Sequence, residues 1–210
     1  MTDFLEVTRA AYDVVAVSYE ELLRDDLAAN TADRAVLGMF AEHTTGRVAD
    51  VGCGPGRITA HLASLGVDAF GVDLSPGMVE VARERHRGLR FEVGSMTALD
   101  LPDGSLGGVV AWYSLIHVPP ELHPEVFAGF FRALEPGGHL LLAFQAGDEP
   151  RRITEGYGHR IDLTAYRLPP ERTSALLVDA GFEVRTTVVR APEPPNEKTA
   201  QAYLIARKPA

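Results

Sequence analysis

The sequence predicts a single α/β domain built on a doubly wound, mostly parallel β-sheet. Short apolar runs alternate along the chain with longer amphipathic stretches, which is the pattern of such a sheet. The chain has 210 residues, of which 46% are hydrophobic, so one full core can be buried. No segment repeats internally. The whole chain, residues 1–210, is therefore expected to form one domain.

Seven apolar runs are interpreted as strands. They cover residues 47–51, 67–73, 89–93, 108–113, 139–145, 183–190 and 201–207. The turn "PDGS" precedes the fourth strand, and "LEPGG" stops a helix and reverses the chain into the fifth. The last two strands are close in sequence, so they are expected to pair in antiparallel fashion.

Capping residues and helix-ending glycines set the helices around these strands. The helices are expected over residues 3–28, 32–43 and about 57–65, from Pro76 onward, before "LEPGG", and within "LPPERTSALLVDAGF". Asn30 or Thr31 caps the second helix. Ser75 caps the fourth, and Pro76 lies in its first turn, where the missing N–H costs nothing. Gly181 ends the last helix.

These elements divide the domain into four segments. They are an N-terminal helical cap (1–45), a ligand-binding core (46–145), an insertion (146–168) and a C-terminal helix with a strand hairpin (169–210). The insertion contains Gly, Asp, Pro and Arg without strong periodicity. Because it follows the fifth strand, at the carboxyl edge where open α/β sheets bind ligands, it is expected to cover the substrate. A solvated linker over the sheet edge is the alternative.

Composition and charge narrow the classes of function. The net charge of −9 disfavours nucleic acid as a partner, because binding to a phosphate backbone depends on clustered Lys and Arg. The apolar runs are far shorter than the roughly 20 residues that cross a membrane. The single cysteine, Cys53, forms no internal disulfide, and no basic and apolar leader opens the chain, so a cytoplasmic protein is expected. The oligomeric state is left open.

A glycine-rich loop follows the first strand. Gly52, Gly54 and Gly56 occupy alternate positions, and glycine lets a ligand approach the backbone closely. In the dinucleotide-binding pattern the last glycine lies two residues further from its neighbour, so this loop suits a nucleoside without a pyrophosphate. Asp73 ends the second strand, where its carboxylate can accept hydrogen bonds from both hydroxyls of a ribose. A ribose of NAD would satisfy Asp73 equally well.

Four ordered motifs resemble those of the class I S-adenosylmethionine-dependent methyltransferases. "DVGCGPGRIT" is similar to the first motif of that family, "GVDLSPGMVEVAR" to its second strand and following helix, "LRFEVGSMTALDLPDGSLGGVVAWYSLIHV" to its third and fourth strands, and "FRALEPGGHLLLAF" to its fifth. The similarity covers nearly the whole chain. A glycine triplet alone is a weak signal, but four motifs in the same order make the resemblance to this family specific. The resemblance implies a Rossmann-like sheet of seven strands with an antiparallel last strand.

The resemblance also implies S-adenosylmethionine as the cofactor and S-adenosylhomocysteine as its product. The residues expected to contact it are Tyr12, Tyr19, Asp50, Gly52, Cys53, Gly54, Gly56, Asp73, Leu74, Met78, Ser95, Met96 and Tyr113. In the family, the acidic residue at the position of Asp50 interacts with the methionyl end of the cofactor; a carboxylate that caps the loop is the alternative. Leu74 and Met78 are expected to pack on the adenine, although Met78 equally suits the core. Cys53 is most simply a small filler of the loop.

Two further expectations concern the adenine and the cover of the cofactor. The family commonly has an acidic residue after the third strand that accepts from the adenine amino group, and this chain has Gly94, Ser95 and Met96 there. The Ser95 hydroxyl and the Met96 N–H are the expected substitutes. Tyr12 and Tyr19 lie seven residues apart and share one face of the first helix. That helix is expected to close over the cofactor, with plain packing on the core as the alternative.

The sequence after the fourth strand narrows the acceptor and the chemistry. Enzymes of the family that methylate DNA amines or glutamine amides carry Asn or Asp, Pro-Pro and an aromatic residue there, where this chain has "WYSLIHVPP". No carboxylate lies between Trp112 and Pro120 to bind a metal, as the catechol methyltransferases require, so a metal-independent enzyme is expected. His117, just past the strand, and His159, in the insertion, are the candidate bases, with an inert surface histidine as the alternative for each. An unperturbed imidazole predicts a rate that rises with pH through about 6 to 7.

The expected function is therefore methyl transfer from S-adenosylmethionine to an O, N or S atom of a small molecule such as a specialised metabolite. An enzyme acting on protein or RNA is an alternative, disfavoured by the acidity of the chain. A module that binds the cofactor without catalysis would bind it tightly and methylate no acceptor. An NAD oxidoreductase would change the absorbance of reduced nicotinamide and show no affinity for S-adenosylhomocysteine.

Overall fold

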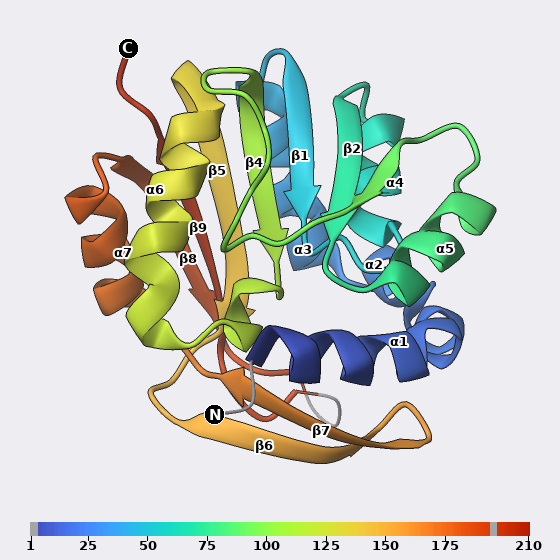
Figure 1. The fold of residues 1–210 in the computed structure, drawn as a ribbon. Coiled ribbons are helices and arrows are strands. Elements are labelled where there is room, and N and C mark those ends of the chain that lie inside the picture. The colour runs from blue at the N-terminus through green and yellow to red at the C-terminus, as the bar shows by residue number, and fades with distance from the viewer. Residues whose placement is uncertain (1–3, 194–196) are drawn as a thin grey trace.

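The strands form one central sheet, shown in Figure 1. The computed structural model describes residues 4–193 and 197–210, and within them seven strands pair in the order β3-β2-β1-β4-β5-β9-β8. They are β1 (Arg47–Val51), β2 (Asp68–Asp73), β3 (Phe91–Val93), β4 (Leu106–Trp112), β5 (Leu134–Gln145), β8 (Glu183–Arg190) and β9 (Gln201–Arg207). Strands β1 to β5 are parallel, whereas β9 is antiparallel to both of its neighbours. The predicted fold class is confirmed.

Helices cover both faces of this sheet. They are α1 (Phe4–Leu23), α2 (Asp26–Ala29), α3 (Thr31–His43), α4 (Arg57–Ser64), α5 (Pro76–Arg85), α6 (His123–Ala133) and α7 (Pro170–Asp179). Phe40 of α3 and Leu62 of α4 pack in one cluster with Val110 of β4, and Phe127 of α6 packs in another with Val109. Val109 and Val110, which are neighbours in β4, therefore point to opposite faces of the sheet. In the part of the chain that the structure describes, every helix is too short or too polar to span a membrane.

Two predicted helix caps are present. The side chain of Asn30 accepts a hydrogen bond from the N–H of Asp33 (3.1 Å) at the start of α3. The hydroxyl of Ser75 accepts one from the N–H of Met78 (3.0 Å) at the start of α5. Each cap satisfies a backbone N–H that has no partner inside its helix. The Ser75 cap matters most here, because it orders the segment directly after Asp73.

Most predicted boundaries lie within two residues of those in the structure, but two differ by more. The helix expected over residues 3–28 is divided at residues 24–25 into α1 and α2, because the chain turns there; residue 3 itself lies outside the described residues. The turn "LEPGG" does not precede the fifth strand but is a bulge inside β5. Leu134 already pairs with β4, and regular pairing resumes at His139.

The insertion is an ordered β-hairpin rather than the aperiodic segment that was expected. Strands β6 (Pro150–Gly156) and β7 (His159–Tyr166) pair in antiparallel fashion. Tyr157 and Gly158 at the turn have φ values of +53° and +78°, as a two-residue turn of type I′ requires. Most of β6 is exposed, so its sequence lacks the alternation by which a strand is recognised. Backbone pairing across the turn forms this element.

Helix α1 crosses the carboxyl edge of the sheet and lies between that edge and the hairpin (Figure 1). The carboxylate of Asp13 accepts hydrogen bonds from the hydroxyl of Ser75 (2.6 Å) and from the N–H of Gly77 (3.0 Å). On the hairpin side, the ring of Tyr19 lies 4.7 Å from the ring of Tyr157, measured between centroids. Helix α1 is thus fixed to α5 and to the hairpin at once.

Replacing Asp13 by alanine is expected to loosen α1 without unfolding the sheet. The substitution removes the acceptor of two donors in the first turn of α5, and a cap of this kind contributes about 1 kcal/mol. Urea titration should show a fall of about that size in the free energy of unfolding, and limited proteolysis should cut within α1 sooner. Asp13→Asn, which keeps an acceptor oxygen, is the matched control. An alanine variant as stable and as resistant as the native chain contradicts this role.

Candidate active site

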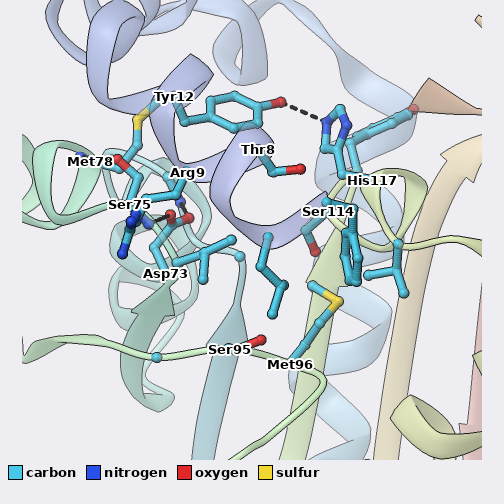
Figure 2. Close-up of a pocket in the computed structure, with 18 of the residues that line it drawn as sticks. Thr8, Arg9, Tyr12, Asp73, Ser75, Met78, Ser95, Met96, Ser114 and His117 are labelled. Atoms are coloured by element: carbon cyan, nitrogen blue, oxygen red, sulfur yellow. Dashed lines mark hydrogen bonds between the residues drawn. The ribbon is translucent and has the colours of Figure 1, made fainter. Parts of the chain in front are cut away.

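A cavity opens at the carboxyl edge of the sheet, beneath α1, with about 710 Å³ of empty space that includes open solvent. Its wall is built by α1, the loop after β1, the ends of β2 and β4, and the segment after β3 (Figure 2). Of the residues predicted from the sequence, the wall contains Tyr12, Tyr19, Gly52, Gly54, Asp73, Leu74, Met78, Ser95, Met96, Tyr113 and His117. The cavity lies at the carboxyl ends of the parallel strands, where open α/β sheets bind their ligands.

The ends of β1 and β2 form a polar recess at one end of this cavity. Asp73 is only 9% exposed, and its carboxylate accepts hydrogen bonds from the N–H of Gly54 (2.7 Å) and of Ser75 (2.9 Å). Burial raises the pKa of Asp73 to about 6, and the two N–H groups oppose that shift. A Cβ on Gly54, whose φ is +55°, would meet nothing nearer than the Met78 sulfur at 4.0 Å. The loop backbone is therefore open to a ligand, and carboxylate lone pairs of Asp73 remain for its hydroxyls.

Three predicted residues of the loop region lie outside the cavity wall. Asp50 is completely buried; one of its oxygens accepts from the Thr59 hydroxyl (2.7 Å), the other has no partner among the described residues, and burial raises its pKa to about 7. Cys53 is buried among residues of α5 and β3, as a filler of the loop would be. A Cβ on Gly56 would lie 2.6 Å from the ring of Phe91, so this glycine makes room for protein packing.

His159 also lies outside the wall. It begins β7, in the hairpin beyond α1 (Figure 1), and its Nε2 lies 2.9 Å from the hydroxyl of Ser18 on that helix. The contact ties the hairpin to α1, so the expectation that both histidines line one pocket is not met in this structure. We therefore assign no proton transfer to His159.

His117 lies at the other end of the cavity from Asp73, with its ring beside Tyr12 of α1 (Figure 2). The Tyr12 hydroxyl and the His117 Nε2 are 2.6 Å apart, and the His117 Nδ1 is 3.0 Å from the carbonyl oxygen of Thr164 in β7. Because a carbonyl only accepts, this geometry assigns the proton to Nδ1, and Nε2 accepts from the Tyr12 hydroxyl. One hydrogen-bonded chain thus connects α1, the end of β4 and the hairpin.

Burial keeps both members of this pair neutral. It lowers the pKa of His117 to about 4, and the bond to Thr164 opposes the shift only in part. It raises the pKa of the Tyr12 phenol well above its usual range, with Tyr19 and Tyr157 adding to the effect. The imidazole is therefore already neutral between pH 6 and 7. The sequence-based prediction that the rate rises with pH between 6 and 7 is therefore wrong, because it assumed a solvated imidazole.

The segment after β4 packs directly on the glycine loop. The hydroxyl of Ser114 donates to the carbonyl oxygen of Val51 (2.7 Å). A Cβ on Gly52 would lie 2.2 Å from the Cβ of Ser114, which no side chain tolerates. Gly52 is therefore required by this close approach as well as by any ligand. This contact therefore joins the glycine loop, at one end of the cavity, to the segment that leads to His117, at the other end.

The cavity wall includes residues that sequence reasoning did not assign to the site. They are Phe4, Leu5, Thr8, Arg9, Ser75, Gly94, Trp112, Ser114 and Val118. Thr8 and Arg9 lie four and three residues before Tyr12 and share its helical face. Counting three and four residues back from Tyr12, the spacing of one helical face, would have found them. Across the described ranges, no group of three or more His, Cys, Asp and Glu side chains is placed to hold a metal ion.

Comparisons with known proteins agree with this geometry. Residues 48–138 match the family model described as a methyltransferase domain. Phosphoethanolamine N-methyltransferase 3 of Arabidopsis thaliana is 31% identical over 143 residues, which cover 65% of this chain and 29% of that protein. Demethylmenaquinone methyltransferase of Beutenbergia cavernae is 33% identical over 136 residues, which cover 63% of this chain and 55% of the relative. The chain thus spans less than two thirds of the length of these curated relatives.

A solved structure extends the comparison to the whole chain. The 1,6-didemethyltoxoflavin-N1-methyltransferase of Burkholderia thailandensis superposes with a TM-score of 0.73 at 21% identity, covering 100% of this chain and 92% of the other. At that identity the likeness shows the fold. By its fold and by the sequence of residues 48–138, the chain belongs to the class I S-adenosylmethionine-dependent methyltransferases.

Proposed function

We propose that this chain is an enzyme that transfers a methyl group from S-adenosylmethionine to an O, N or S atom of a small molecule, without a metal ion. The observation that carries the proposal is a single cavity with two chemically different ends. One end has an open glycine loop and the Asp73 carboxylate, and the other has the Tyr12–His117 pair. Membership of the methyltransferase family supports methyl transfer as the reaction.

The first end suits the nucleoside of the cofactor. Asp73 is a buried hydrogen-bond acceptor that can take both ribose hydroxyls, and Gly54 leaves the loop backbone open beside it. Leu74 and Met78 supply apolar contact for the adenine. Ser95 stands where the family commonly has a carboxylate, and its hydroxyl lies 2.8 Å from that of Thr97. This contact orients the Ser95 hydroxyl, which can both donate and accept a hydrogen bond.

The second end suits the removal of a proton. When bound, S-adenosylmethionine would supply an activated methyl group, whose carbon bonds to the acceptor as its bond to the sulfur breaks and S-adenosylhomocysteine leaves. The chain has to position that acceptor, exclude water and take up its proton. The Tyr12 oxygen takes the proton of the acceptor as its own proton moves to Nε2 of His117, while the bond to Thr164 holds the ring. A base of this modest strength suffices where the attacking atom becomes strongly acidic on gaining a methyl group, as a hydroxyl oxygen does.

A small acceptor fits the enclosure better than a macromolecule. Helix α1 covers the cavity and is itself fixed to α5 and to the hairpin, so a polypeptide or nucleic acid would have to displace both contacts. The net charge of −9 adds repulsion against nucleic acid. The Burkholderia neighbour holds 1,6-didemethyltoxoflavin and S-adenosylhomocysteine, which is a small acceptor beside the product of the cofactor.

Asp73→Ala is expected to weaken the binding of S-adenosylhomocysteine by about 1.5–3 kcal/mol, on the order of ten- to a hundredfold, because charge-assisted bonds to the ribose are lost. Isothermal titration calorimetry measures the affinity, and a thermal melt checks that the variant is folded. Asp68→Asn, at the exposed opposite end of the same strand, is the matched control and should bind as the native chain does. Unchanged affinity in a folded Asp73→Ala variant, or binding of NAD in place of S-adenosylhomocysteine, contradicts the assignment.

Tyr12→Phe and His117→Ala are each expected to lower kcat by about 10²–10⁴, the usual contribution of a general base, with the affinity for S-adenosylhomocysteine kept. Because the two side chains act as one unit, the double variant should lose little more than the worse single variant. The measurement is steady-state kinetics with the best acceptor from a small-molecule screen, and His43→Ala, at the last residue of α3, is the control. A native kcat in both single variants and in the double variant would show that the Tyr12–His117 pair takes no part in the mechanism.

A further inference from the structure

We propose that Tyr113 is a positioning residue of this active site. Its backbone holds the turn after β4 in the conformation that brings Ser114 against the glycine loop and His117 against Tyr12. The inference rests on the function proposed above, because it concerns how the Tyr12–His117 pair is kept in place. It also gives Tyr113 a role different from the cofactor contact that the family resemblance suggests.

The backbone of Tyr113 is strained. Its φ is +52°, in the left-handed region that a bulky side chain occupies only at a cost. Among the non-glycine residues that the structure describes, only Tyr157 shares this feature, and the hairpin turn accounts for Tyr157. Tyr113 instead lies in the cavity wall, directly after β4. Strain at such a place persists only where surrounding contacts hold it.

Two hydrogen bonds hold Tyr113. Its N–H donates to the carbonyl oxygen of Ala143 in β5 (2.8 Å), and its hydroxyl donates to the side-chain oxygen of Gln201 in β9 (2.8 Å). Gln201 is only 3% exposed, and its side-chain amide donates in turn to the carbonyl of Thr199 (2.8 Å). The phenol is thus anchored to a rigid and buried amide at the first residue of β9. Burial also raises the pKa of Tyr113, so the hydroxyl remains a donor at any working pH.

The strained turn fixes the residues that follow it. Ser114 comes next and bonds the carbonyl of Val51, beside Gly52. The N–H of His117 then donates to the carbonyl of Ser114 (3.2 Å), which begins a 3₁₀ turn (Leu115–His117) that presents the imidazole to Tyr12. If Tyr113 relaxed to a negative φ, this turn would swing away from the glycine loop. His117 would then lose its fixed place between Tyr12 and Thr164.

The bond between Tyr113 and Gln201 should therefore control the state of the His117 ring. In the native chain, ¹⁵N NMR of labelled histidine, assigned with His117→Gln, is expected to show a neutral ring protonated on Nδ1 with a pKa near 4. In Tyr113→Phe the ring should lose its fixed tautomer, and its pKa should rise toward the ordinary value of about 6.5 as water reaches it. Gln201→Leu should have the same effect, and the double variant should add nothing to either single change.

Controls separate this role from the alternatives. Tyr166→Phe removes a phenol from β7 that lies outside the cavity wall and should leave the His117 spectrum native. The affinity for S-adenosylhomocysteine should change by less than about threefold in Tyr113→Phe, since the phenol points to Gln201, and kcat should fall while KM for the cofactor stays.

An unchanged His117 spectrum in folded Tyr113→Phe and Gln201→Leu variants overturns the proposal. A tenfold loss of S-adenosylhomocysteine affinity in Tyr113→Phe with a native His117 spectrum also overturns it, in favour of a cofactor contact. If the native chain binds no S-adenosylhomocysteine, the proposed function fails instead, while the spectrum still reports whether Tyr113 positions His117.

Discussion

The hydrogen bond between Tyr12 and His117 connects parts of the chain that are 105 residues apart, and much of the site depends on it. It fixes α1 across the carboxyl edge of the sheet, and the bond from His117 to Thr164 extends the connection to the hairpin. Helix α1 shields the Tyr12–His117 pair from water, which strengthens the electrostatic interaction between the two side chains. The same burial makes the imidazole a weak base. The burial of the pair and the weak basicity of the imidazole therefore follow from one contact.

The charges of the site follow from this enclosure. His117 and Tyr12 are both neutral, so the acceptor end of the cavity carries no formal charge from the pair. Asp73, at the other end, is stabilised by two backbone N–H groups rather than by a cation. In the function proposed above, a positively charged cofactor would meet a carboxylate at one end and polarisable rings at the other, and this arrangement would orient it.

The sequence predicted those features that depend on local pattern. The glycine loop and Asp73 follow neighbouring parallel strands, whose carboxyl ends meet at one edge of a sheet, so their proximity could be inferred. His159 could not be placed in the same way, because its direction depends on the register of a hairpin that the exposed residues of β6 concealed. Nothing in the sequence indicated the left-handed backbone of Tyr113, because glycine or asparagine is the usual residue in that conformation. Long-range contacts decided these cases.

The most direct test of the account is a crystal structure of the chain with S-adenosylhomocysteine. The account predicts the nucleoside in the cavity beneath α1, with the ribose hydroxyls on the Asp73 carboxylate and the sulfur directed toward the Tyr12–His117 pair. It also predicts that Asp13 still binds Ser75 and Gly77, so that α1 remains across the bound ligand. Ligand density elsewhere on the molecule, or a sulfur directed away from Tyr12 and His117 in a fully occupied cavity, would contradict it.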